Sequence, residues 1–232
     1  MVAYTATYTG SREVYIADLR GNAPSRRVTY LDSKYGALHV VQWIGDEEVV
    51  FSAYSMEAFM DETRLYRVRV AGKEGEIGKV TPIPLYQAND AAIISNDDEE
   101  CTYFVRYKQS SNTIRYVGGT AENIWGWCAG DKTAFKVSGD YNGTSRSPRL
   151  MLSNVDEDKY LLFLSDRNNA GVNPKPVITN LFALQLGGDL LPLPEIEQPL
   201  IKLTNVCDGI GIADFAVDKS NGAFWKSFYF TT

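Results

Sequence analysis

Histidine is almost absent from this chain of 232 residues, which contains only His39. A Ser-His-Asp triad needs an imidazole beside an exposed nucleophile, and the sequence has no G-x-S-x-G motif to present one. His39 lies in residues 38–43, whose alternating pattern predicts a strand with His39 on the same face as Val41 and Trp43. We therefore expect a structural histidine and assign no catalytic residue.

Cysteine is also scarce. Cys101, Cys128 and Cys207 are odd in number and far apart, so they predict neither a disulfide framework nor a C-x-x-C metal or redox site. A reducing compartment fits this usage best. Zinc sites built from histidine and cysteine lack ligands here, so we expect no metal site and no cofactor.

The sequence has no run of lysine or arginine, and its net charge is -6 with a pI near 4.9. Phosphate groups are bound by clustered cations, so this composition argues against a nucleic-acid partner and an anionic membrane. No apolar run approaches the length of a membrane span, and residues 1–4 lack the basic start of a signal peptide. We expect neither segment.

Three acidic runs are the candidates for carboxylate chemistry. Each falls between two strand-like segments, where a turn is expected. We interpret them as solvated hairpin tips rather than as acid–base pairs. They are Asp46-Glu47-Glu48, Asp97-Asp98-Glu99-Glu100 and Asp156-Glu157-Asp158.

What the chain does contain is a series of β-branched and aromatic runs separated by glycine, asparagine and aspartate. Hydrophobic residues make up 44% of the sequence, enough to fill a core. Helical periodicity is missing, and the best helix candidate, residues 56–60, is too short and is interpreted as a loop.

One stretch organises this pattern: residues 115–125, RYVGGTAENIW. An aromatic strand at residues 102–107 leads into it, and a second strand begins at residues 123–125. The pair Gly118-Gly119 predicts a bend, because glycine enters backbone regions closed to other residues. A phosphate-binding loop is the weaker interpretation, since it needs a following Lys-Ser/Thr and a helix.

Three landmarks recur with a spacing of about 50 to 60 residues, the length of a repeat unit. One is a strand with an aromatic residue near its middle, at residues 48–52, 102–106, 161–165 and 224–228. The next is an aliphatic-aromatic step that opens the following strand: Val14-Tyr15, Leu65-Tyr66, Ile124-Trp125 and Leu181-Phe182. The last is an apolar residue followed by a hydroxyl: Val28-Thr29, Val80-Thr81, Val137-Ser138 and Leu203-Thr204.

Four antiparallel strands per repeat predict an all-β fold, a partial β-propeller of about four blades. A β-sandwich is the alternative; the propeller is favoured because several strands are apolar on both faces. We expect a single propeller domain or fragment over residues 1–232, beginning and ending in the second strand of a blade (residues 2–8 and 224–232). Its blade segments are residues 1–31, 37–85, 91–139, 147–205 and 212–232.

The order of several motifs resembles the N-terminal propeller of the tricorn proteases. They are YTGSREVYIADL (residues 8–19), RVTY (27–30), RYVGGTAENIW (115–125), SRSP (145–148) and LFLSDR (162–167). The resemblance spans nearly the whole chain. It departs from the family pattern in a longer loop at residues 168–176 and a proline-rich insertion at residues 190–199. The spacing of Asp166, Asn168 and Gly171 is only loosely that of a calcium loop and is interpreted as a turn.

The resemblance implies a cytoplasmic, self-compartmentalising serine peptidase that degrades peptides downstream of the proteasome. In that family a six-bladed propeller precedes a seven-bladed one and the regions that carry catalysis. This chain would then be a scaffold and peptide-access channel. Its partners would be peptides and the remaining domains, with a homo-oligomer possible. The alternative is a non-enzymatic TolB/WD40-like propeller that binds a protein partner.

Overall fold

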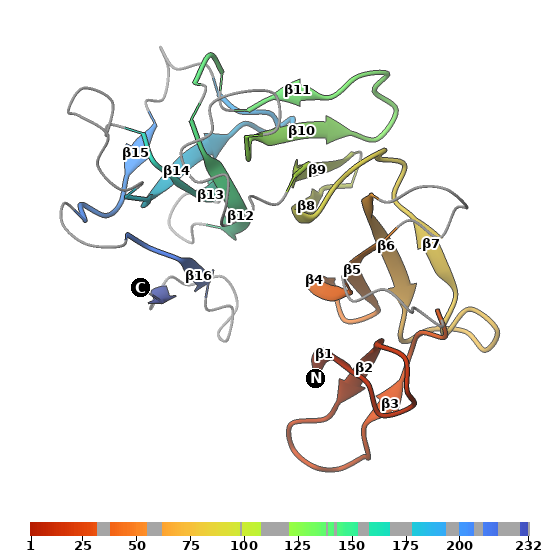
Figure 1. The fold of residues 1–232 in the computed structure, drawn as a ribbon. Helices are drawn as coiled ribbons and strands as arrows, with labels where there is room; N and C mark the ends of the chain where they lie inside the picture. The colour runs from red at the N-terminus through yellow and green to blue at the C-terminus, as the bar shows by residue number, and fades with distance from the viewer. Residues whose placement is uncertain are drawn as a thin grey trace. The chain divides into compact units, whose positions relative to one another are not determined.

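A computed structural model describes residues 1–31, 38–54, 62–97, 99–107, 121–137, 139–141, 143–152, 158–167, 178–193, 200–206, 211–217 and 228–231. The regular elements in this part of the chain are all strands (Figure 1). They are β1 (Val2–Ala6), β2 (Glu13–Ala17), β3 (Arg26–Arg27), β4 (His39–Ile44), β5 (Glu48–Tyr54), β6 (Thr63–Arg69), β7 (Val80–Pro82), β8 (Asp90–Ser95), β9 (Glu100–Val105), β10 (Ile124–Cys128), β11 (Phe135–Lys136), β12 (Ser145–Leu152), β13 (Lys159–Ser165), β14 (Asn180–Leu186), β15 (Ile201–Lys202), β16 (Asp214–Val217) and β17 (Phe228–Thr231).

The strands form five antiparallel sheets in two compact units, residues 1–90 and 91–232. The first unit holds a three-stranded sheet, β1-β2-β3, and a four-stranded sheet, β4-β5-β6-β7. The second holds two four-stranded sheets, β11-β10-β9-β8 and β12-β13-β14-β15, and the pair β16-β17. The all-β prediction and the four-stranded antiparallel repeat are confirmed.

Sheet β12–β15 is buried on both faces, and strand alternation explains how. Leu161 and Phe163 of β13 face one hydrophobic cluster with residues of β9 and β10, including Tyr103. Leu162 and Leu164 face a second cluster with Phe215 of β16. Figure 1 shows β8–β11 and β16 on opposite sides of this sheet. Sheets therefore stack face against face in this unit, as propeller blades do.

The predicted aromatic landmarks pair directly across neighbouring strands. The partners in register are Tyr4 and Tyr15, Phe51 and Tyr66, Phe104 and Trp125, and Phe163 and Phe182. The rings stack with centroids 5.8 Å apart for Tyr4 and Tyr15, 5.6 Å for Phe51 and Tyr66, and 6.0 Å for Phe163 and Phe182. Such pairs stabilise neighbouring strands beyond their buried area.

Two sheets share a hydrogen-bonded lock between their last two strands, β2 and β3 in one sheet and β14 and β15 in the other. In the first, Glu13 accepts the Thr29 hydroxyl at 2.6 Å and the Leu31 N–H at 3.0 Å. Thr29 Oγ1 in turn accepts the Val14 N–H at 2.9 Å. The carboxylate is fully buried and also forms an ion pair with Arg27, at 2.9 Å.

In the other sheet an asparagine takes the place of this glutamate. Asn180 Oδ1 accepts the Thr204 hydroxyl at 3.1 Å and the Val206 N–H at 2.7 Å, while Thr204 Oγ1 accepts the Leu181 N–H at 2.9 Å. The hydroxyl of the third landmark therefore ties the outer strand to the start of its neighbour.

In the sheet β4–β7, the landmark of an apolar residue followed by a hydroxyl was assigned to the wrong position, Val80-Thr81. Backbone bonds from Val28 to Val14, Val137 to Ile124 and Leu203 to Leu181 define equivalent positions. The corresponding bond in β4–β7 runs from Ile83 N–H to the Leu65 carbonyl, 2.9 Å. Ile83 followed by Pro84 is thus the equivalent of Val28-Thr29, and Val80-Thr81 lies three residues too early. Proline has no hydroxyl, so the sequence pattern fails there.

The face assigned to His39 is also wrong. The β4–β5 register shifts between Val40 and Gln42, so that His39 lies opposite Ser52 and Trp43 opposite Val49. Residues 49 and 52 point to opposite faces of β5, because strand side chains alternate. The β-bulge therefore separates His39 from Trp43, which packs with Val40 on the core cluster.

A disulfide joins Cys101 and Cys128, contrary to the expectation of unpaired cysteines. The two residues lie directly opposite each other on β9 and β10, and both are fully buried. The sequence did not predict this disulfide because the two cysteines are 27 residues apart. A hairpin with a long connection brings such distant positions into register.

Several sequence features lie outside the described residues, including the Gly118-Gly119 bend, residues 56–60 and Asn168. Within the part of the chain that the structure describes, no helix is long and apolar enough to cross a membrane.

Glu13 gives folding a defined dependence on pH. Burial alone raises the pKa of the Glu13 carboxyl, but the hydrogen bonds from Thr29, Leu31 and Ser11 and the charge of Arg27 outweigh it and lower the pKa. The charged form is thus favoured in the folded state. This contribution is present above the carboxyl's unfolded pKa of about 4.3 and is lost as the pH falls through the lower, folded value.

Glu13→Gln is expected to flatten this acid limb in denaturant titrations between about pH 5 and pH 2, the interval in which carboxyl groups titrate. The amide oxygen of glutamine is neutral and can still accept hydrogen bonds, as Asn180 Oδ1 accepts those from Thr204 and Val206. Glu13→Ala leaves the buried Thr29 hydroxyl and Leu31 N–H without this acceptor and should cost about 3 kcal/mol. Equal acid sensitivity of the wild type and Glu13→Gln would contradict the assignment.

The Cys101–Cys128 bond predicts the thiol count. In protein purified without reductant and then denatured, iodoacetamide should alkylate Cys207 alone, and all three cysteines after reduction. Mass spectrometry of the peptides measures this, with Cys128→Ser as a control that exposes two thiols. Three alkylated cysteines without reductant would show that the bond does not form.

Candidate functional site

Among the described residues, His39 and Ser52 form a histidine–serine contact of the kind that a serine hydrolase uses. Ser52 Oγ lies 3.0 Å from His39 Nδ1, across the β4–β5 pair. Ser52 is fully buried in the middle of its strand. A nucleophile must reach a substrate carbonyl and sit beside an oxyanion site, and a buried hydroxyl in a sheet does neither. The contact is a cross-strand hydrogen bond that supports the sheet.

The acidic runs are described in part, since Asp98, Asp156 and Glu157 lie outside the described residues. Asp46 and Glu47 lie in the turn before β5, whereas Glu48 is its first residue. Glu48 accepts from Arg69 at 3.0 Å, and Arg69 also pairs with Glu76 at 2.6 Å. Hydrogen bonds to Glu48 and Glu76 raise the pKa of Arg69. With Arg67, Lys79 and Thr81, these residues line a polar hollow of about 250 Å³ that holds three cations and two carboxylates.

Glu99, Cys101 and Cys128 bring potential metal ligand atoms within 4.8 Å of one another in the described residues. Metal binding by cysteine requires thiolates. Here the two sulfur atoms are bonded to each other. The cluster is therefore described by its disulfide, and the arrangement supports no metal centre.

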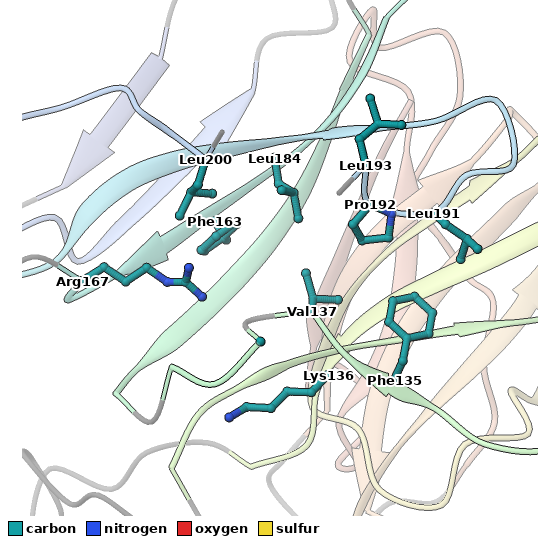
Figure 2. Close-up of a pocket in the computed structure, with 11 residues that line it drawn as sticks. Phe135, Lys136, Val137, Phe163, Arg167, Leu184, Leu191, Pro192, Leu193 and Leu200 are labelled. Carbon is teal, nitrogen blue, oxygen red and sulfur yellow. The ribbon is translucent and has the colours of Figure 1, made fainter. Parts of the chain in front are cut away.

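An apolar pocket lies in the second unit and has a volume of about 430 Å³ (Figure 2). Phe135 and Val137, in and just after β11, line one wall. Phe163 of β13 and Leu184 of β14, in the neighbouring sheet, form the floor of the pocket. Leu191 to Leu193, in the loop after β14, form a further wall. Lys136 and Arg167 are its charged members. Pockets of this size and apolar character are typical of binding sites.

Phe135 is held in place by its neighbours. It lies opposite Gly126 on β10, and a Cβ atom added at Gly126 would stand only 2.2 Å from the Phe135 ring. The ring also meets Tyr103 edge-on, with centroids 6.5 Å apart. Glycine at position 126 is thus required for the ring to lie flat against β10.

The loop wall is tied to the other sheet by hydrogen bonds. The buried Tyr103 hydroxyl donates to the Leu190 carbonyl, and Asn96 Nδ2 donates to the Gly188 carbonyl at 3.3 Å. Burial raises the pKa of Tyr103, so the hydroxyl stays a donor at neutral pH. Leu190 has a positive φ of 60°, and the Gly187 N–H to Leu191 carbonyl bond closes the turn. The walls of the pocket are therefore preformed.

The charged end is braced by Tyr141 and Asp166. Lys136 Nζ donates to the Tyr141 carbonyl at 2.9 Å, and the Arg167 guanidinium lies 4.7 Å from the Tyr141 ring centre. Asp166 accepts the Tyr141 hydroxyl and the Thr144 N–H. Burial and the hydrogen bond to Asp166 raise the pKa of Tyr141. The sequence pattern does not predict this pocket, because its residues come from four separate segments.

Four-stranded antiparallel sheets stacked on their faces define the class as a β-propeller protein. The model of the tricorn protease N-terminal β-propeller domain matches residues 1–192, and the chain belongs to this family. Searches of curated proteins and of solved structures each gave no match. The family assignment agrees with the resemblance that the ordered sequence motifs carry.

Removing the Ser52 hydroxyl tests its role. Ser52→Ala is expected to lower the free energy of unfolding by about 1 kcal/mol, the usual contribution of one buried hydrogen bond. A serine-directed fluorophosphonate should leave Ser52 unmodified in the folded protein, as judged by mass spectrometry. Stoichiometric labelling of Ser52, lost in Ser52→Ala and in His39→Gln, would instead identify a reactive pair.

Proposed function

We propose that this chain is the scaffold and peptide-access portion of a tricorn-like serine peptidase that degrades peptides downstream of the proteasome. The observation that carries the proposal is the family match over residues 1–192. On this proposal catalysis belongs to regions of the peptidase outside this sequence. The buried position of Ser52 beside His39 is in keeping with that division of labour.

The stacked sheets suit a supporting role. A sheet covered on both faces, such as β12–β15, is held by the side chains packed against each face. Peptides and the remaining domains of the peptidase are the proposed partners, and a homo-oligomer is compatible with self-compartmentalisation.

The proposed compartment is the cytoplasm, on the strength of the family. A disulfide is unusual there, since soluble thiols reduce accessible bonds. Both sulfur atoms of Cys101–Cys128 are shielded by the core, so exchange with a soluble thiol requires local opening of β9 and β10.

The second candidate is a non-enzymatic propeller of the TolB/WD40 type that binds a protein partner. The preformed apolar pocket beside β11 favours it, because binding there would need no catalytic region.

The two candidates differ in the gene and in activity. The peptidase proposal expects the reading frame to continue after Thr232 into a second propeller and a serine-peptidase region. It also expects the purified 232-residue chain to leave fluorogenic peptides uncleaved, while the full-length protein cleaves them. A gene that ends soon after Thr232, or cleavage by the purified chain that is lost in Ser52→Ala or His39→Gln, would overturn the proposal.

A further inference from the structure

The apolar pocket has a defined polarity. In the view of Figure 2, Arg167 and Lys136 lie on one side of it, and Phe135, Pro192 and Leu191 lie on the other. Lysine and arginine carry a positive charge, which arginine presents on a planar guanidinium. A ligand that fits must therefore place an apolar body against one side and an anionic group against the other.

Local charge decides this complementarity, because the protein as a whole carries a net charge of -6. An acidic ligand gains nothing from the overall field and must be attracted by the pocket itself. Asp166, the residue before Arg167, accepts hydrogen bonds from Tyr141 and Thr144. Arg167 stacks on Tyr141 and lies 5.8 Å from the Phe163 ring centre, so its guanidinium is held at the rim of the apolar floor.

The neighbouring strands indicate the form of the ligand. β11 and β15 are the last strands of their sheets. Phe135 and Lys136 belong to β11, and Leu200 directly precedes β15. A terminal strand presents backbone N–H and C=O groups along one edge, which an extended chain can pair with. A free small molecule would use none of these groups.

We propose that the pocket binds an extended peptide segment of a partner protein in which a large apolar side chain stands next to an aspartate or glutamate. The apolar side chain fills the space between Phe135, Leu184 and Leu191. The carboxylate meets Arg167 and Lys136. This inference goes beyond the scaffold role and stands without it, since it concerns internal acidic residues of a partner and no cleavage.

The test is fluorescence anisotropy of a short labelled peptide with Leu-Phe-Asp at its centre, blocked at both ends so that it has no terminal charges. We expect saturable binding by the full 232-residue chain. The matched Leu-Phe-Asn peptide should bind about tenfold or more weakly, because its neutral amide cannot form an ion pair with Arg167.

Variants place the interaction in the pocket. Arg167→Leu should weaken binding of the Asp peptide about tenfold and remove the preference for Asp over Asn. Lys132→Leu is the matched control, because Lys132 is an exposed cation outside the pocket and its loss should change nothing. Since Arg167 packs on two rings, Leu191→Glu is a second variant: Leu191 is 37% exposed, and a carboxylate there should repel the peptide.

Three results would overturn the proposal. One is no binding of the Asp peptide at about 1 mM, the weak limit of specific recognition. Another is equal affinity for the Asp and Asn peptides. The third is that a fluorescent fatty acid binds in the pocket and is displaced by sodium octanoate, while the peptide does not bind. The pocket would then be a site for free aliphatic carboxylates. Loss of peptide binding in Leu191→Glu with an unchanged melting temperature supports the proposal independently of Arg167.

Discussion

Burial of both faces of a twisted sheet is the constraint on which this structure depends. A four-stranded sheet with apolar side chains on two sides cannot be stable in water by itself, so it needs a neighbour on each face. In β12–β15 the odd and even positions of β13 serve two separate hydrophobic clusters. Cross-strand aromatic pairs lie within the sheets, and in the sheets β1–β3 and β12–β15 side-chain hydrogen bonds hold the short outer strand.

The same constraint accounts for the pocket. Sheets that meet at their faces diverge toward their outer strands, because each sheet is twisted. The space between β11 and the β13–β14 surface is closed on one side by the loop that Tyr103 ties down. Binding potential in this molecule therefore arises where the stacking geometry leaves a gap, and its chemistry is set by the few side chains that border it.

The repeat could be predicted from the sequence because strand alternation and aromatic steps are local signals. Val14-Tyr15 and Leu181-Phe182 are both an aliphatic residue followed by an aromatic one, and each pair lies near the start of a strand.

Three features of the strands could not be predicted from the sequence, each for a physical reason. The bulge in β4 inserts one residue and reverses the face of everything after it. Ile83 is recognised only by its hydrogen bond, and the partnership of Cys101 and Cys128 depends on a register that residue spacing does not reveal. The pocket was missed because its walls come from separate segments whose proximity depends on tertiary packing.

The locks at Glu13 and Asn180 have a consequence for how such a fold can change over evolution. Each lock is made entirely from residues of one sheet, between the start of one strand and the end of the next. Duplication or deletion of a repeat would therefore add or remove one complete lock and would leave the locks of the other repeats intact. The exchange of a charged acceptor for a neutral one between two repeats shows that the donors, Thr29 and Thr204 with the following backbone N–H, are what the geometry retains. Individual repeats can thus drift in charge, and hence in surface recognition, without losing their internal alignment.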